Sequence, residues 1–477
     1  MYAATTSVAL VGGDVRPVEV QVHVGRQSDQ FKLSGLPDTA VREAKDRVRA
    51  AVMSSGIRFP NRTVTVNLAP AHLPKSGTDF DLPIAIGVLA ASNEIPHPGA
   101  AIVVGELALD GSVRSGAGTI GAAVLSARSG SPCIVAGGSA AEVAAVPGSK
   151  VFGVSSLAQA VDLLRTGLDT LPLAHPRAPA EPEGAGDMSE VRGQPIARRA
   201  IEIAAAGGHH LLLHGPPGGG KTMLARRLPG ILPPLGDGEA VEVALVHAAA
   251  GLRRGLTRDR PFRSPHHTAS RAALVGGGSG VAVPGEVSLA HRGVLFVDEM
   301  AEFPRANLDT LRQPLEDGTV TVARRGVTAT FPSSFHLVGA TNPCPCGYAG
   351  DRRKPCDCRP ASVARYRQRV SGPLLDRFDL VVKVDRLEPS DATGPEPDPT
   401  AEVRRRVVSA HSRLAVGAPP LTKAAAQLLV TALGNSLLTA RGVDRVRGVA
   451  TTICALADED EVLEEHVAEA IGLRTDW

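Results

Sequence analysis

Apolar and polar positions alternate in ways that separate strand-like from helix-like stretches. Residues 18–24 and 63–68 alternate apolar and polar side chains, as strands with one buried face do. Residues 38–53 repeat apolar side chains at helical spacing, and Asp38 stands at the position of an N-cap. The first part of the chain is therefore predicted to mix strands and helices.

Three short apolar runs in the middle of the chain each end in polar residues. They cover residues 210–214, 293–297 and 336–339. Buried parallel strands have this pattern, and function gathers at the carboxyl ends of such strands. We therefore expect an α/β core on a parallel sheet. From residue 401 the pattern predicts Ala- and Leu-rich helices.

Two stretches lack this periodicity and are rich in Pro with Ala, Gly or Asp. Residues 174–187 and 388–400 are predicted to be exposed linkers. They divide the chain into predicted domains 1–173, 188–387 and 401–477, each of ordinary domain size.

Composition narrows the class of protein. The 477 residues carry 51 Lys and Arg against 49 Asp and Glu, a net charge of +2, so any nucleic-acid site must be a local basic patch. Aromatic residues make up 3%, which disfavours a single-strand binder built on base stacking. Apolar runs such as residues 82–91 are too short to span a membrane, and the N-terminus does not resemble a secretion signal. We expect a cytoplasmic protein without a membrane partner.

The strongest chemical signal is Gly-Pro-Pro-Gly-Gly-Gly-Lys-Thr at residues 215–222, between an apolar run and a helical pattern. This is the strand–loop–helix context of a phosphate-binding P-loop, and a chance glycine-rich turn would not need those flanks. Lys221 would reach the β- and γ-phosphates, and the Thr222 hydroxyl would bind Mg²⁺. The residues predicted to form the loop around ATP are Gly215, Pro216, Pro217, Gly218, Gly219 and Gly220.

Acidic and amide side chains end the other two apolar runs. Asp298 is predicted to hold Mg²⁺, and Glu299 to orient and deprotonate the water that attacks the γ-phosphate. Asn342 is predicted to position that water, although an asparagine at this place also suits a turn. Arg377 follows a short helical segment. It is either a solvated ion-pair partner or an arginine finger toward a neighbouring subunit.

Four of the six cysteines lie within 15 residues. In a cytosolic protein such a cluster indicates metal binding rather than disulfides. Four thiolates would form a closed, structural Zn²⁺ site. The C-x-C pairs have one residue between the two cysteines, whereas zinc sites usually have two to four. Redox-sensitive thiols are the alternative. The four residues are Cys344, Cys346, Cys356 and Cys358.

Together these motifs resemble those of AAA+ ATPases, and nearly the whole chain is similar to the ComM/YifB family of magnesium-chelatase-like AAA+ proteins. The segments that carry this resemblance are 33–42, 66–70, 79–84, 263–268, 342–347 and 371–377. The resemblance implies a Lon-protease-like α+β domain, an AAA+ core with a helix-2 insert and a pre-sensor hairpin, and a C-terminal helical lid.

The family resemblance also implies a function. It implies a ring, expected to be a hexamer, that hydrolyses ATP and drives DNA branch migration when transforming DNA is integrated. Related chelatase subunits instead drive Mg²⁺ insertion into porphyrin. The alternatives are therefore a chelatase-like or protein-remodelling ATPase that acts on a protein partner, and a nucleotide-dependent scaffold with little turnover.

Further residue roles follow from the resemblance. Asp79 stands at the Lon nucleophile position and Ala122 where its lysine is expected, so the domain is predicted to be non-proteolytic. A hairpin over residues 319–331 would present Arg324 and Arg325 to DNA phosphates, unless they are ordinary surface charges of an exposed turn.

The C-terminal part departs from the family pattern. Arg441 lies in a segment that resembles the sensor-2 region and would approach the nucleotide. Downstream, three residues differ from those that the family pattern has at these positions: Arg447, Gly448 and Thr451. Because a glycine inside a helix costs ~1 kcal/mol relative to alanine, we expect weaker lid packing and weaker motor activity.

Overall fold

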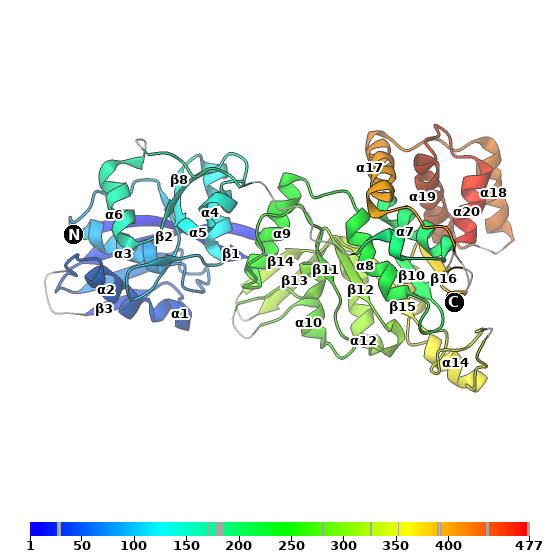
Figure 1. Cartoon of the computed structure of the whole chain (residues 1–477). Coiled ribbons are helices and arrows are strands. Elements are labelled where there is room, and N and C mark those ends of the chain that lie inside the picture. The colour runs from blue at the N-terminus through cyan, green and yellow to red at the C-terminus, as the bar shows by residue number, and fades with distance from the viewer. Residues whose placement is uncertain are drawn as a thin grey trace.

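A computed structural model of the chain describes most residues in one continuous arrangement (Figure 1). A sheet-based amino-terminal part lies at one end, a second sheet-based part in the middle and a group of helices at the other end. The described residues are 1–25, 30–168, 171–177, 186–278, 281–324, 327–351, 353–388, 391, 394–435 and 438–474. Among the helices within these ranges, none is long and apolar enough to cross a membrane.

The amino-terminal part is a seven-stranded mixed sheet of order β3-β4-β2-β1-β5-β8-β9. Strands β1, β2 and β4 pair antiparallel, whereas β5, β8 and β9 are parallel to one another. The strands are β1 (Tyr2–Val11), β2 (Asp14–Val24), β3 (Phe31–Ser34), β4 (Val64–Ala69), β5 (Ile102–Val103), β8 (Pro132–Ala136) and β9 (Lys150–Val154); a separate pair is β6 (Glu106–Leu107) and β7 (Val113–Arg114). The two strands predicted from alternation correspond to β2 and β4.

Helices pack on this sheet. The predicted helix 38–53 is two helices, and the Asp38 carboxylate caps the first by accepting from the Val41 backbone N–H at 2.8 Å. The apolar run 82–91 is part of α3, all of whose residues are buried, which accounts for its hydrophobicity. The helices are α1 (Thr39–Arg42), α2 (Ala44–Ser54), α3 (Asp81–Ala91), α4 (Gly118–Ser129), α5 (Gly137–Val143) and α6 (Leu157–Thr166).

The middle part is a five-stranded, fully parallel sheet of order β11-β12-β15-β10-β16. The three apolar runs found in the sequence form β12, β15 and β10, which are neighbours, so their carboxyl ends lie at one edge of the sheet. The strands are β10 (Leu211–His214), β11 (Phe262–Arg263), β12 (Val294–Val297), β15 (His336–Thr341) and β16 (Leu380–Lys383).

Helices and a hairpin surround this sheet. The larger helices are α7 (Pro195–Gly207), α8 (Lys221–Ile231) and α9 (Asp237–Ala249); shorter ones are α10 (Arg271–Val275), α11 (Glu286–Leu289), α12 (Arg305–Leu308), α13 (Arg312–Asp317), α14 (Pro360–Arg367) and α15 (Gly372–Leu375). The hairpin pairs β13 (Thr319–Arg324) with β14 (Val327–Pro332), as predicted for residues 319–331. The Arg324 side chain and Arg325, predicted to contact DNA, lie outside the described residues.

Within the described residues, the C-terminal part has four helices: α17 (Thr400–Val416), α18 (Lys423–Gly434), α19 (Ala440–Leu456) and α20 (Glu464–Gly472). Helices α17 and α19 share a hydrophobic core with α7 and the middle sheet. Helix α19 continues without a break across Gly448. The unusual residues of this segment therefore do not interrupt the helix.

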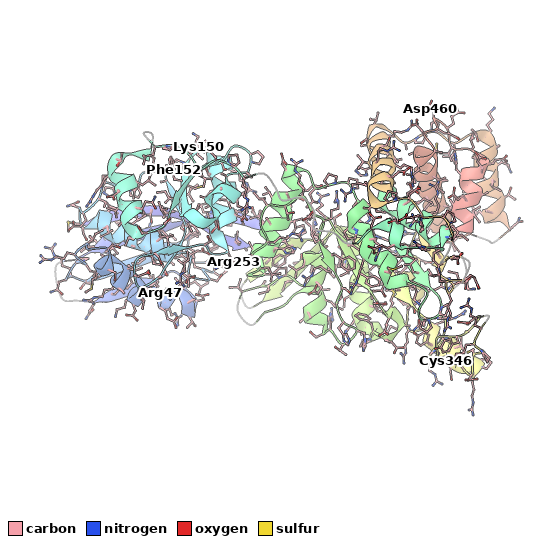
Figure 2. The ribbon with its side chains drawn as sticks, in the orientation of Figure 1. Arg47, Lys150, Phe152, Arg253, Cys346 and Asp460 are labelled. Carbon is pink, nitrogen blue, oxygen red and sulfur yellow. The ribbon has the colours of Figure 1, made fainter. Side chains whose placement is uncertain are left out.

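The amino-terminal and middle parts contact each other at three places. At the tip of the β1–β2 hairpin, the Gly13 backbone N–H donates to the Thr330 carbonyl in β14 at 3.0 Å. Apolar residues of α4 and α9, such as Val124 and Leu245, belong to one hydrophobic cluster. Arg253, placed between the two parts in Figure 2, donates to the Ser115 carbonyl at 2.9 Å. A cavity of about 800 Å³ lies between these contacts.

A candidate nucleotide-binding site

The glycine-rich loop runs from β10 to the first residue of α8. Gly218 and Gly220 have φ of +82° and +87°, in the left-handed region that favours glycine. A Cβ on Gly215 would lie 2.0 Å from the Val384 carbonyl oxygen, so only glycine fits this close approach. These constraints explain the residue types of the loop. The loop places the N-terminus of α8, where free N–H groups favour an anion, at the carboxyl edge of the sheet.

Lys221 is buried at the centre of this loop. Its ammonium group donates to the carbonyls of Gly215 and Pro216 at 2.7 and 2.9 Å, and to Asn342 Oδ1 at 3.3 Å. Burial lowers the pKa of Lys221 to about 8, so the ammonium form still predominates at neutral pH. The predicted Asn342 therefore lies beside the predicted lysine, although 121 positions separate them in the chain.

Thr222 and Asp298 also come together. The Thr222 hydroxyl donates to Asp298 Oδ2 at 2.8 Å, and Asp298 Oδ1 accepts from the Glu299 backbone N–H at 2.9 Å. A hydroxyl and a carboxylate are hard oxygen ligands of the kind that bind Mg²⁺ next to a nucleotide. The side chains present therefore fit Mg²⁺, and the glycine loop with its buried lysine fits the phosphates of ATP.

Glu299 occupies a different position from its neighbour Asp298. Its backbone has φ of +48°, and its side chain is 57% exposed. The carboxylate lies 3.4 Å from His267 Nδ1. The centre of the His267 ring lies 4.1 Å from that of His266, and the two rings are tilted by 33°. The Nδ1 of His266 pairs with the Thr268 hydroxyl at 2.9 Å.

The sequence did not predict the contact between His267 and Glu299. Adjacent histidines on a loop are more often hydrogen-bonded than catalytic, and His266 is hydrogen-bonded to Thr268. His267 reaches Glu299 because the two residues follow β11 and β12, which are neighbouring strands. Each of the two residues lies just after a strand. This position predicts their contact only once β11 and β12 are known to be neighbours.

Arg377 lies in a cluster of arginines. It is 8% exposed and forms an ion pair with Glu316. Burial and the nearby guanidinium groups of Arg441, Arg445 and Arg312 lower the pKa of Arg377. Arg377 is therefore not the solvated partner that one reading of the sequence expected.

The arginine cluster is held partly by Asp379. Arg445 pairs with that carboxylate and donates to the Arg377 carbonyl at 2.9 Å. Arg441 is exposed on α19. Among the contacts that the structure describes, neither Arg377 nor Arg441 touches the P-loop, so the two predicted arginines belong to a separate group.

A second cavity of about 250 Å³ adjoins the P-loop. Gln194, at the N-terminus of α7, takes a left-handed conformation with φ of +56° and donates to the Gly219 carbonyl at 3.3 Å. Sequence analysis did not single out this residue. The cavity is lined by Gln194, Pro195, Ile196, Pro216, Asp351, Arg353, Lys383, Asp385, Arg386, Glu388 and Asp391.

The predicted Lon nucleophile position holds a buried carboxyl group. Asp79 Oδ2 accepts the Gly118 backbone N–H at the start of α4 at 2.8 Å. Burial is the main cause that raises the pKa of Asp79 to about 6. Ala122 is buried in α4, and Ser76 is exposed. The non-proteolytic reading stays a prediction, and it rests on the residue types at these positions.

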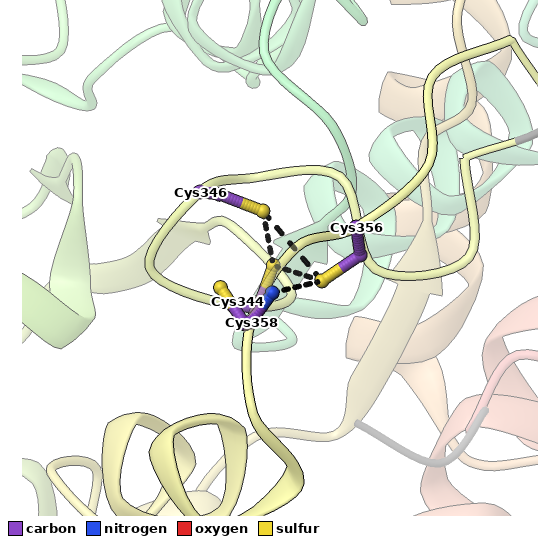
Figure 3. A group of neighbouring side chains, drawn as sticks. All are labelled: Cys344, Cys346, Cys356 and Cys358. Carbon is purple, nitrogen blue, oxygen red and sulfur yellow. Dashed lines mark hydrogen bonds between the residues drawn. The ribbon is translucent and has the colours of Figure 1, made fainter.

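The four clustered cysteines converge beside the glycine-rich loop of the nucleotide site. Their sulfur atoms all lie within 4.8 Å of one another, in the segment between β15 and α14 (Figure 3). This segment projects from the core at the position of Cys346 in Figure 2.

A parallel sheet with a P-loop after β10, an acidic pair after β12 and an asparagine after β15 is typical of the AAA+ type of P-loop protein. Comparison with protein families agrees. The model described as magnesium chelatase, subunit ChlI, matches residues 187–392, and a second ChlI model matches residues 18–138. A model of the ChlI C-terminal part matches residues 417–474.

Three relatives resemble the chain over almost all of its length. An uncharacterized protein of Mycobacterium tuberculosis is 43% identical, over 98% of this chain and 97% of its own. Competence protein ComM of Haemophilus influenzae is 40% identical, over 99% and 97%. The uncharacterized protein YifB of Escherichia coli is 40% identical, over 98% and 96%. The chain belongs to the ComM/YifB family of magnesium-chelatase-like proteins.

Proposed function

We propose that this protein is a cytoplasmic, Mg²⁺-dependent ATPase whose hydrolysis of ATP drives a motor on branched or single-stranded DNA. The observation that carries the ATPase part is the convergence of Lys221, Thr222, Asp298 and Asn342 at the carboxyl edge of one sheet. This grouping brings together a cation for the phosphates, two hard ligands for Mg²⁺ and an amide for water.

In the proposed reaction, Lys221 pairs with the β- and γ-phosphate oxygens of ATP, while Thr222 and Asp298 hold Mg²⁺. The ion, when bound, neutralises charge on the phosphates. Asn342 orients the attacking water, and the Glu299 carboxylate accepts its proton. Because Glu299 contacts His267 in this structure, its carboxylate has to turn from the imidazole toward the water.

The proposed motor is a ring, a hexamer by the family resemblance. Within it, Arg377 acts as an arginine finger for the neighbouring subunit, which requires its release from Glu316. The C-terminal helices serve as the lid that presents Arg441, and the amino-terminal part serves as a non-proteolytic, Lon-like platform. The ion pair joins the buried Arg377 to the half-exposed Glu316, so release of Arg377 from Glu316 is a point at which the finger could be controlled.

Two features support DNA as the target. One is the hairpin of β13 and β14, whose tip segment contains Arg324 and Arg325, two cations suited to phosphates. The other is the similarity to a protein named for competence. The match to magnesium chelatase subunits favours a second candidate, an ATPase that remodels a protein partner.

The steady-state ATPase rate, with and without forked or four-way DNA at low and moderate salt, tests the proposal. We expect DNA to stimulate hydrolysis and salt to weaken the stimulation, because phosphate contacts release counterions. The double variant Arg324→Ala, Arg325→Ala should keep basal hydrolysis and lose the DNA response. Hydrolysis that ignores DNA would favour a protein partner. Full hydrolysis by Glu299→Gln would contradict the assigned base.

A further inference from the structure

The sulfur atoms of Cys344, Cys346 and Cys356 form a nearly equilateral triangle. The Sγ distances are 3.4 Å between Cys344 and Cys346, and 3.6 Å from each of these to Cys356. The Cys358 sulfur completes the group, with all four within 4.8 Å (Figure 3). In a tetrahedral site with Zn–S bonds of about 2.3 Å, neighbouring sulfurs lie about 3.8 Å apart. The cluster therefore has the size of a four-thiolate zinc site.

These distances do not suit a disulfide. An S–S bond is about 2.05 Å long, and all six cysteines of the chain are free. A pair of redox-sensitive thiols would also leave the third and fourth sulfur without a reason to converge. The geometry thus favours metal over the redox alternative that the sequence left open.

Backbone amides supply a second, independent observation. The Ala349 N–H donates to the Cys344 sulfur at 3.2 Å, and the Cys358 N–H donates to the Cys356 sulfur at 3.4 Å. Hydrogen bonds of this kind orient metal ligands and stabilise the negative charge of thiolates. Each C-x-C pair therefore has one sulfur that accepts a backbone amide.

The segment also needs a stabilising centre. Between β15 and α14, the described residues of 342–359 form neither helix nor strand. Loops of this length without secondary structure are uncommon in compact domains, and this one has few buried apolar side chains to hold it. A closed four-sulfur site would fix its fold without offering an open position for catalysis.

One side of the segment lies on the P-loop. Cys344 comes two residues after Asn342, and a Cβ on Gly347 would lie 2.9 Å from Pro217 Cδ. Asp351 and Arg353 line the cavity next to Pro216. A change in the fold of this segment would therefore reach both Asn342 and the glycine-rich loop.

The other side is tied to the chain after β16. Asp351 pairs with Arg386 at 3.0 Å, and the Arg386 guanidinium lies over the Tyr348 ring at 5.2 Å. Arg353 pairs with Glu388 at 2.8 Å. These contacts connect the cysteine segment to the far wall of the same cavity.

We propose that Cys344, Cys346, Cys356 and Cys358 bind one structural Zn²⁺, and that the ion holds the wall of the nucleotide site and the position of Asn342. The metal site stands on the sulfur geometry and the backbone hydrogen bonds to sulfur, and it does not depend on the proposed function. Its effect on the nucleotide rests on the function proposed above. The two parts are therefore tested separately.

Metal content tests the site. The full chain, purified without a metal-affinity step or added zinc, is expected to contain one zinc per chain by elemental analysis. Replacement with Co²⁺ should give the absorption bands of a tetrahedral four-thiolate centre. A metal-free protein whose four thiols all react at once with a thiol reagent would overturn the proposal. A coloured iron centre would overturn the assignment to zinc.

Nucleotide affinity tests the coupling. The double variant Cys344→Ser, Cys356→Ser should lose zinc and bind a fluorescent ATP analogue on the order of tenfold more weakly. Cys133→Ala removes a buried thiol outside the cluster and should keep both zinc and affinity. If the double variant does not fold, zinc is instead withdrawn from the intact protein with a chelator and the affinity measured before and after restoring zinc.

The outcomes separate the two proposals. Unchanged affinity after zinc loss would overturn the coupling and leave the ATPase proposal standing. Bound zinc in a protein that binds no nucleotide would contradict the ATPase proposal and leave the metal site standing.

Discussion

At the residue scale, several side chains of the candidate site are held by groups that follow other strands of the same parallel sheet. Lys221 reaches Asn342, Thr222 reaches Asp298, and Glu299 reaches His267. The first two contacts join residues that the sequence had already marked. The third joins the predicted Glu299 to His267, which was not among the predicted site residues, and it restrains the carboxylate proposed to act as the base.

Replacement of His267 tests that restraint. Because the imidazole competes with water for the Glu299 carboxylate, His267→Ala should raise the ATPase rate without DNA by about two- to tenfold, as expected for the loss of one polar contact. His266→Ala is the matched control, since His266 pairs with Thr268 instead. A lower rate in His267→Ala, with His266→Ala unchanged, would show that the imidazole assists the base.

The buried Asp79 predicts a pH dependence of stability. Because the folded-state pKa is raised to about 6 from 3.8, the protonated carboxyl favours the folded state. Its stabilising effect is complete below pH 3.8 and is lost as the pH rises through about 6. Relative to wild type, Asp79→Asn should gain up to about 3 kcal/mol between pH 4 and pH 7.

Hydrogen exchange of the α4 amides in the full chain, corrected for intrinsic rates, measures this difference. The exposed Asp110, whose pKa is lowered by a hydrogen bond from the Ser112 backbone, offers a control. Asp110→Asn should keep the wild-type decrease between pH 4 and pH 7. An unchanged pH dependence in Asp79→Asn would show that other groups cause it.

At the scale of elements, the apolar runs of the middle part were predictable and the shortest strands were not. Strands β10, β12 and β15 are buried on both faces, so their sequences are continuously apolar. Strands β5 and β11 have two residues each, too few to show any period. Alternation found β2 and β4, but strand order depends on contacts between distant parts of the chain.

The phosphate- and Mg²⁺-binding residues of the candidate site were predictable from the sequence, whereas the residues that contact them across the fold were not. The P-loop residues and Asp298 are fixed by chemistry that needs particular residue types at fixed spacing. Gln194 and His267 act through contacts across the fold, and their local sequence carries no such signature. Arg377 was recognised as a candidate, but its ion pair with Glu316 depends on packing.

Gly448 in α19 provides a test of helix stability. The sequence suggested that this glycine weakens the C-terminal helices, yet α19 is continuous there. A Cβ would lie 3.8 Å from His209 Cε1, an ordinary contact, so Gly448→Ala should raise stability by about 0.5–1 kcal/mol.

Thermal unfolding of the full chain measures this effect. Gly121→Ala, inside α4, is the matched control. Its Cβ would lie 3.0 Å from a Leu10 methyl carbon, so the same change should give no gain there. Destabilisation by Gly448→Ala would mean that α19 needs the flexibility of glycine.

At the scale of the whole molecule, the β1–β2 turn connects the amino-terminal part to the hairpin of β13 and β14. Gly12 has φ of +66°, and a Cβ there would lie 2.3 Å from the Thr330 carbonyl oxygen. Gly13 donates to the same oxygen. The amino-terminal part therefore contacts β14, the strand that follows the proposed DNA-contacting tip of the hairpin.

Substitution of Gly12 tests this connection. Gly12→Ala should separate the turn from β14 and increase hydrogen exchange of the β13–β14 amides several-fold, because one side of β14 loses its contact. Gly56→Ala is a close control, since Gly56 has a similar φ of +72° and no atom within 4 Å of its Cβ position. Equal exchange in the two variants would indicate backbone strain rather than a lost contact.

The same contact has a consequence for the order of events during translation. Gly13 leaves the ribosome some 300 residues before Thr330, its partner. At about 5–20 residues per second, the interval is roughly 15–60 s. The amino-terminal domain therefore has time to fold alone, with the Val124 side of α4 open to water until α9 emerges. In the nascent chain, this apolar surface is available to a chaperone.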